Sequence, residues 1–195
     1  MQKSLLALFF SLLVLMPLSA QKKSASGKEP LFGSKQASYQ IASNELKGAC
    51  FYLVCGHGGP DPGAIGIYQG RQLHEDEYAY DIVLRLGREL LMRGAKVHFI
   101  IQDKKDGIRG GHYLANSKRE TCMGQKIPLD QVQRLKQRCD WVDKLYKQDK
   151  GNYKRAIFVH VDSLSQGKQT DVYFYHAKGS RNGKRLADRL RTTFA

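Results

Sequence analysis

Residues 51–57 read FYLVCGH, an apolar run that stops at Gly56 and is followed directly by His57. A short continuous apolar run bounded by glycine is typical of a strand that is buried on both faces. Residues 57–70 then contain several Gly and two Pro, which predicts a loop immediately after this strand. We therefore expect His57 near the carboxyl end of a buried strand.

Outward from this stretch, helices and strands alternate along the chain. A helix is predicted over residues 75–93, where large apolar side chains recur every four residues and Gly94 follows as a stop. Further strands are predicted over 96–102, 156–161 and 171–176, further helices over 129–146 and 179–194, and a long polar loop over 103–127. The side of the second helix expected to be buried carries Val132, Leu135, Cys139, Val142 and Tyr146.

This order predicts an α/β fold with a single open sheet, largely parallel or mixed, and helices on both of its faces. Ligands of such folds bind at the carboxyl ends of the strands. Residues 49–195 are long enough to form one domain with a sizeable core.

The N-terminal part of the chain is predicted to lie outside that domain. Residues 1–20 combine Lys3, an apolar run and small residues at their end, which is the pattern of a cleaved secretory signal. An uncleaved membrane anchor is the alternative, although the apolar run is short for a bilayer span. Residues 21–48 are rich in Ser, Lys, Gln and Gly and predict a linker or loosely held arm.

The formal net charge of +14 suits an acidic polymer, anionic lipid or nucleic acid, or serves solubility alone. The export signal argues against nucleic acid as the partner, and the bacterial cell wall is one such acidic polymer. We expect no stable membrane span after signal cleavage, and a monomer. The four Cys include no C-x-x-C spacing, and the side chains of Cys50 and Cys55 would face opposite sides of one strand, so no bond is expected between those two.

Three residues are candidates for chemistry at the carboxyl edge of the sheet. His57 follows the first strand and His160 lies near the end of the third. Glu75 begins the first helix on the face that packs against the sheet, whereas Asp76 and Glu77 are expected to be solvated. A carboxylate aimed at a core edge is costly unless it is paired or bound to a cation, although Glu75 would also serve as a simple helix-dipole cap. Two His and one carboxylate suit a catalytic zinc ion with an open coordination position.

Residues 56–66, GHGGPDPGAIG, closely resemble the opening zinc loop of the zinc-dependent N-acetylmuramoyl-L-alanine amidases. The segment that starts at Glu75 and the segment 157–163 are similar to the family's other ligand-bearing segments, and the resemblance covers roughly residues 49–194. It implies that His57, Glu75 and His160 bind Zn²⁺, and that Arg138 is a candidate for substrate binding. The implied activity is cleavage of the amide between N-acetylmuramic acid and L-alanine in peptidoglycan, in the periplasm or outside the cell.

The sequence departs from the family pattern at two places. The family usually has an Asp before its Gly-His pair, where this chain has Val54 and Cys55. The family also carries a catalytic Glu on a later strand, and no Glu follows Glu120 here. Three explanations are open: the chain is a fragment of a longer enzyme, it is an inactive zinc-containing peptidoglycan-binding relative, or Asp162 acts as the base.

Overall fold

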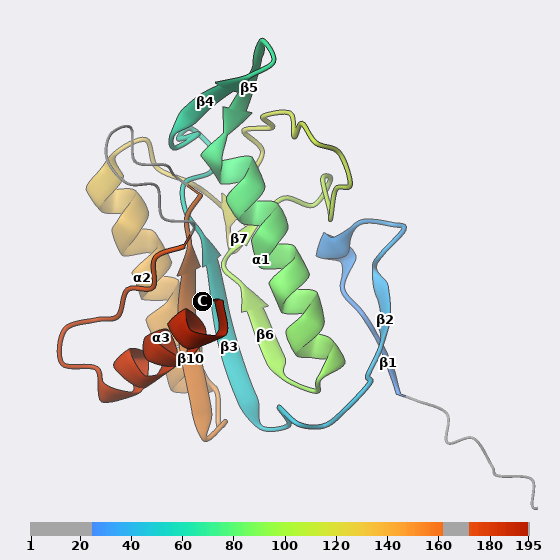
Figure 1. Ribbon diagram of the computed structural model, residues 1–195, viewed down its shortest axis with the longest axis vertical. Coiled ribbons are helices and arrows are strands. Elements are labelled where there is room, and N and C mark those ends of the chain that lie inside the picture. Colours follow the sequence, from blue (N-terminus) through green and yellow to red (C-terminus); the bar gives the residue numbers. More distant parts are fainter. Residues whose placement is uncertain (1–24, 162–171, 195) are drawn as a thin grey trace, which may run out of the picture.

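The computed structural model describes residues 25–161 and 172–194 and is built around a parallel sheet (Figure 1). The central strand β3 (Ala49–Cys55) lies between β10 (Tyr153–Val159) and β6 (Lys96–Phe99), and all three run in the same direction. Every residue of β3 is buried, as expected of an apolar strand that is covered on both faces. Because the strands are parallel, the carboxyl ends of β3 and β10 meet at one edge of the sheet.

Helices cover both faces of this sheet, which confirms the predicted α/β class (Figure 1). The helix α1 (Glu75–Met92) packs on one face, where Gly87 lets it approach Leu53 and Phe99 closely. The helix α2 (Gln131–Gln148) covers the opposite face, and α3 (Arg181–Phe194) lies on the same side as α1 in Figure 1. The first helix and the first strand therefore form where the apolar pattern placed them.

The prediction for the buried side of α2 was wrong. Val132 is 73% exposed, and Leu135, Cys139 and Tyr146 are exposed as well. The helix instead turns Arg138 and Leu145 inward, with Trp141 and Val142 packed against the core between them. The hydrogen bond between the buried Arg138 guanidinium and a backbone carbonyl therefore decides which side of α2 faces inward. The spacing of apolar residues does not reveal such a contact.

The N-terminal segment belongs to the folded body over its described part and is not a loose arm. The strands β1 (Ser26–Lys28) and β2 (Ser38–Gln40) pair antiparallel, with a 3₁₀ turn η1 (Pro30–Phe32) between them. The ring of Phe32 is fully buried and meets Phe99 edge to face at a centroid distance of 5.7 Å. The buried Leu31 and Phe32, with Tyr39 packed against Phe32, explain why a polar segment is held down. The predicted signal, residues 1–20, lies outside the described residues.

The two regions predicted as loops contain short strands. Within 57–70, β4 (Ile65–Tyr68) pairs with β5 (Arg71–His74), and the turn between them has positive φ at Gln69 and Gly70, as a tight hairpin requires. Within 103–127, β8 (Thr121–Cys122) pairs with β7 (Ile101–Gln102) and with β9 (Gln125–Lys126).

The strand predicted over 171–176 is absent from its described part, residues 172–176, where Tyr173 and Tyr175 are exposed. Asp171 lies outside the described residues. Across residues 25–161 and 172–194, no helix has the length and apolar character needed to cross a bilayer. All four cysteines carry free thiols, and Cys139 is the exposed one.

Candidate metal centre

The three predicted ligands meet at the carboxyl edge of the sheet. His57 lies in the loop after β3, Glu75 is the first residue of α1, and His160 directly follows β10. The Oε2 atom of Glu75 is 3.2 Å from His57 Nε2, and its Oε1 atom is 3.0 Å from His160 Nδ1. The two imidazole rings stand at right angles with centroids 5.1 Å apart. One ligand atom from each residue lies within 4.8 Å of the other two, which is close enough for one metal ion.

Two glycines make this convergence possible. A Cβ atom at Gly63 would lie 2.7 Å from Glu75 Oε2 and from the His57 ring, and a Cβ atom at Gly56 would lie 2.4 Å from the His160 ring. Gly63 also has a φ of 70°, a conformation that side chains other than glycine rarely adopt. The glycine-rich sequence after β3 therefore creates the space in which the ligand atoms meet.

The buried carboxylate of Glu75 carries the negative charge of the cluster. Its side chain is only 3% exposed, and it accepts hydrogen bonds from the backbone amides of Ala64 and Val161. Burial by itself would raise the pKa of Glu75, but the Ala64 amide and the two His lower it below its ordinary value. An ionised carboxylate and two imidazoles are a donor set that suits zinc, so the residues present fit that metal.

One side of the cluster is open to solvent. The His160 side chain is 51% exposed, in contrast to the buried Glu75. A catalytic zinc site needs such an open position for water and substrate, whereas a structural site is closed by protein ligands. The exposed side of His160 thus gives the candidate centre the layout of a catalytic site.

Asp61 orients His57, a role that the sequence analysis did not assign. Its Oδ2 atom is 2.9 Å from His57 Nδ1 and accepts a hydrogen bond of 2.7 Å from Arg134 Nη2. Burial acts to raise the pKa of Asp61, but the hydrogen bond with His57 and the nearby Arg134 hold it below its ordinary value. A carboxylate there keeps the proton on Nδ1 and turns the lone pair of Nε2 toward Glu75. The only sequence signal was an acid four residues after a His within one loop.

Arg138, on α2, contacts the backbone of the loop that holds His57. The residue is buried on α2, and its Nη2 atom donates a hydrogen bond to the backbone carbonyl of His57. Burial lowers the pKa of its guanidinium from the usual value. These surroundings support a role in positioning His57, and a contact between Arg138 and substrate stays a prediction.

Asp76 and Glu77 are buried, contrary to the expectation that water would solvate them. Residues 103–120 fold back over the start of α1, so that Arg109 pairs with Glu77 at 2.8 Å and Glu120 Oε2 accepts a hydrogen bond from the Gly59 amide. Burial, together with the acids Glu77 and Glu120, raises the pKa of Asp76 to about 7. This acid cluster ties the start of α1 to the loop that holds His57. A long loop has no periodicity, so its packing could not be predicted from apolar spacing.

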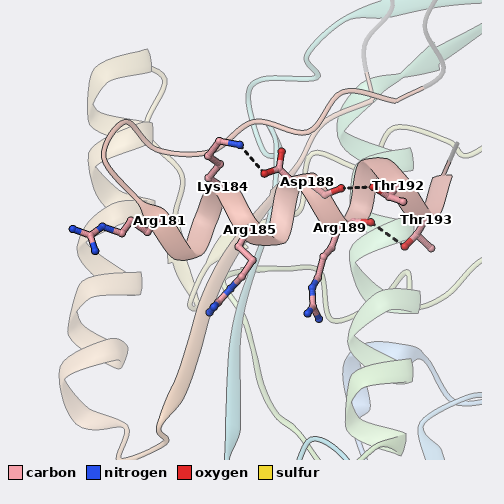
Figure 2. Close-up of a pocket in the computed structure, with 7 residues that line it drawn as sticks. All are labelled: Arg181, Lys184, Arg185, Asp188, Arg189, Thr192 and Thr193. Atoms are coloured by element: carbon pink, nitrogen blue, oxygen red, sulfur yellow. Dashed lines mark hydrogen bonds and ion pairs between the residues drawn. The ribbon is translucent and has the colours of Figure 1, made fainter.

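A pocket elsewhere on the surface is lined entirely by α3 and contains none of the three candidate ligands (Figure 2). Arg185 and Arg189 extend to the same side of the helix, Arg181 extends beyond its first turn, and Lys184 pairs with Asp188 at 2.7 Å on another side. Three guanidinium groups on successive turns form a strip of positive charge, which we call the α3 arginine strip.

The fold and the centre together define an α/β protein with a two-His, one-carboxylate cluster at the carboxyl edge of a parallel sheet. A family model described as N-acetylmuramoyl-L-alanine amidase (Amidase_3) matches residues 52–195, and the chain belongs to this family. No curated protein and no solved structure matches the chain significantly. Asp162, the candidate base, lies outside the described residues.

Proposed function

We propose that this protein is a zinc-dependent peptidoglycan amidase that cleaves the bond between N-acetylmuramic acid and the L-alanine of the stem peptide. The observation that carries the proposal is the convergence of His57, Glu75 and His160 around one point with an open side. Membership of the amidase family supports hydrolysis of an amide in the cell wall. Zinc bound there would supply an activated water at neutral pH and would polarise the carbonyl of the scissile amide.

The residues of the chain prepare this chemistry in defined ways. Glu75 contributes a negative charge that two backbone amides hold in place, and His57 and His160 contribute imidazole nitrogens. Asp61 fixes the tautomer of His57 through the contact with Nδ1. Asp162 follows His160 by two residues, and its action as the proton-accepting base stays a prediction.

The charge of the protein supports a wall polymer as its partner. Peptidoglycan stem peptides carry carboxylates, and the chain has a formal net charge of +14. The α3 arginine strip presents three of these positive charges on successive turns of one helix (Figure 2). Arginine suits carboxylates because its planar guanidinium forms paired hydrogen bonds with them. Residues 1–20, the predicted export signal, would bring the protein to this substrate.

The proposal is tested by incubating the zinc-loaded full chain with purified peptidoglycan and searching for free stem peptides by mass spectrometry. We expect release by the native chain and none by Glu75→Gln, because that change removes the charge at the centre of the cluster. Glu89→Gln is the matched control, since Glu89 lies exposed on the same helix and pairs only with Arg93 at 2.6 Å. A zinc-loaded native chain that releases no stem peptide would contradict amide cleavage and would favour wall binding.

A further inference from the structure

A second polar cluster lies at the opposite end of the sheet from His57. Cys50 is near the start of β3, His98 is in the neighbouring strand β6, and Asp149 caps the C-terminus of α2. Cys50 and Tyr52 point to one face of β3, and the register that pairs them with Lys96 and His98 places all four on the same face. Asp149 approaches this face from α2 and contacts each of the four side chains.

The two carboxylate oxygens of Asp149 have different partners. Three groups converge on Oδ2: Tyr52 Oη at 2.8 Å, His98 Nε2 at 2.9 Å and Cys50 Sγ at 3.2 Å. Lys96 Nζ contacts the other oxygen, Oδ1, at 2.5 Å. Cys50 and Asp149 are buried, whereas the Lys96 side chain is 60% exposed at the rim. The cluster is therefore buried at Cys50 and Asp149, and its exposed rim is formed by Lys96.

A thiol, an imidazole and a carboxylate with this arrangement are close to the spacing that a metal ion requires. Ligand atoms bound to a tetrahedral zinc ion at about 2.0–2.3 Å lie about 3.3–3.8 Å apart. The contacts of Sγ and Nε2 with Oδ2, at 3.2 and 2.9 Å, need to open by only a few tenths of an ångström to admit an ion.

The neighbouring groups fit the roles that surround a metal ligand. Lys96 holds Oδ1 of Asp149, and Tyr52 Oη donates a hydrogen bond to Oδ2, the oxygen that also faces Cys50 and His98, as partners of ligating carboxylates commonly do. The ring of Tyr52 stacks on His98 with an angle of 2° between the planes and fixes the direction of Nε2. The cluster thus has three ligand atoms and two side chains that orient them.

We propose that Cys50, His98 and Asp149 supply three ligands of a second metal site, which stabilises the fold, for zinc or a similar thiophilic divalent cation. Thiolate and imidazole favour such cations over magnesium or calcium, which prefer oxygen ligands. On binding, the Cys50 thiol releases its proton to solvent and the His98 proton moves to Nδ1, so that Sγ and Nε2 are free to coordinate. The ion would join β3, β6 and α2 at the end of the sheet away from the amidase centre, and would stabilise the fold by mass action.

The site is tested with cobalt(II), which reports on sulfur ligation by its absorption spectrum. The reduced full chain is titrated with cobalt(II), and the near-ultraviolet band of thiolate-to-cobalt charge transfer is measured. Among the two proposed centres only this one contains a cysteine, so the band belongs to it alone. We expect the band in the native chain and in Cys139→Ser, which alters the exposed thiol. We expect its loss in Cys50→Ser and in His98→Asn, each checked for native far-ultraviolet circular dichroism.

The same titration separates this site from the amidase centre. His57→Ala is expected to lower the bound cobalt from two equivalents to one and to leave the charge-transfer band intact. A native chain that binds cobalt without any charge-transfer band would overturn the proposal, whatever its amidase activity. A band that persists in Cys50→Ser would overturn it as well, because another thiol would then be the ligand.

Discussion

Each end of strand β3 carries a cluster of potential metal ligands, and the two clusters are contributed by different kinds of elements. At the carboxyl end, His57, Glu75 and His160 come from a loop, a helix start and a strand end, and one His is half exposed. At the amino end, Cys50 and His98 come from adjacent strands, and Asp149 closes over them from α2. The loop and the helix start at the carboxyl end leave room for a substrate. The paired strands β3 and β6, covered by the end of α2, leave no such room at the amino end. Similar donor types therefore suit a catalytic centre at the carboxyl end of β3 and a stabilising metal site at its amino end.

Among the substitutions that distinguish the two ends of β3, Gly63→Ala is expected to have the largest effect, a loss of zinc affinity at the carboxyl end. The new Cβ atom would lie 2.7 Å from Glu75 Oε2 and push apart the ligands of the carboxyl end only. We expect zinc affinity there to fall about 100-fold, comparable to the loss of a group that orients a ligand, measured by competition with a chromophoric chelator. Gly70→Ala is the matched control, because it has a φ of 74° and no atom within 4 Å. Equal losses in both variants would show that backbone strain, not ligand displacement, is responsible.

Removing the carboxylate at the amino end is expected to affect stability in the metal-free protein. Asp149→Ala leaves the buried Tyr52 hydroxyl and the Cys50 thiol without their acceptor, so the free energy of unfolding should fall by about 2 kcal/mol. Urea denaturation measures it. Asp143→Ala, which breaks an exposed pair with Lys147 on α2, should cost less than about 0.5 kcal/mol. A similar small value for Asp149→Ala would mean that water replaces this acceptor freely.

Asp61→Asn is expected to weaken the carboxyl end by a smaller amount. The substitution keeps the shape of the side chain but removes the charge that holds the His57 tautomer and pairs with Arg134. Zinc affinity should fall about 10-fold, at the low end of such effects, by the same chelator competition. Asp140→Asn, an exposed acid paired with Lys136, should leave the affinity unchanged.

The smallest expected effect is on the alkylation of the cysteine thiols, which measures solvent access to Cys50 at the amino end of β3. Burial raises the pKa of the Cys122 thiol to about 11 and also raises the pKa of Cys50, so neither is a thiolate near neutral pH. At about pH 8, iodoacetamide should label the exposed Cys139 in the folded metal-free chain, and the other cysteines only after denaturation. Peptide mapping by mass spectrometry identifies the label. Rapid labelling of Cys50 would show that solvent reaches the cluster.

The fold was predictable where apolar periodicity is strong. The run 51–55 predicted β3, and the apolar spacing over 75–93 predicted the bounds of α1. The side of α1 that is buried was not predicted, because Val83 and Leu84 face the core while Ile82, in the predicted stripe, is 44% exposed. The buried side of α2 was not predictable in this way, since Arg138 turns inward to reach the carbonyl of His57. Phe32 is one aromatic residue in a polar segment, and its burial depends on Phe99, which is distant in sequence.

The convergence of the three candidate ligands was predictable from the sequence, and the contacts that support them were not. His57, Glu75 and His160 were brought together by the rule that carboxyl ends of parallel strands share an edge. Asp61 and Glu120 act from loops, whose course no periodic pattern predicts. No sequence signal links His98 to Asp149, because their contact joins residues 51 positions apart.

The most direct test of the central claim is an anomalous-difference map at the zinc absorption edge, from crystals of the full chain grown with zinc. Our account predicts a peak bounded by His57 Nε2, the Glu75 carboxylate and His160, at the carboxyl edge of the sheet. Crystals of Glu75→Gln should show that peak weakened or lost, and those of Glu89→Gln should retain it. A native map without a peak between these three residues would contradict the account.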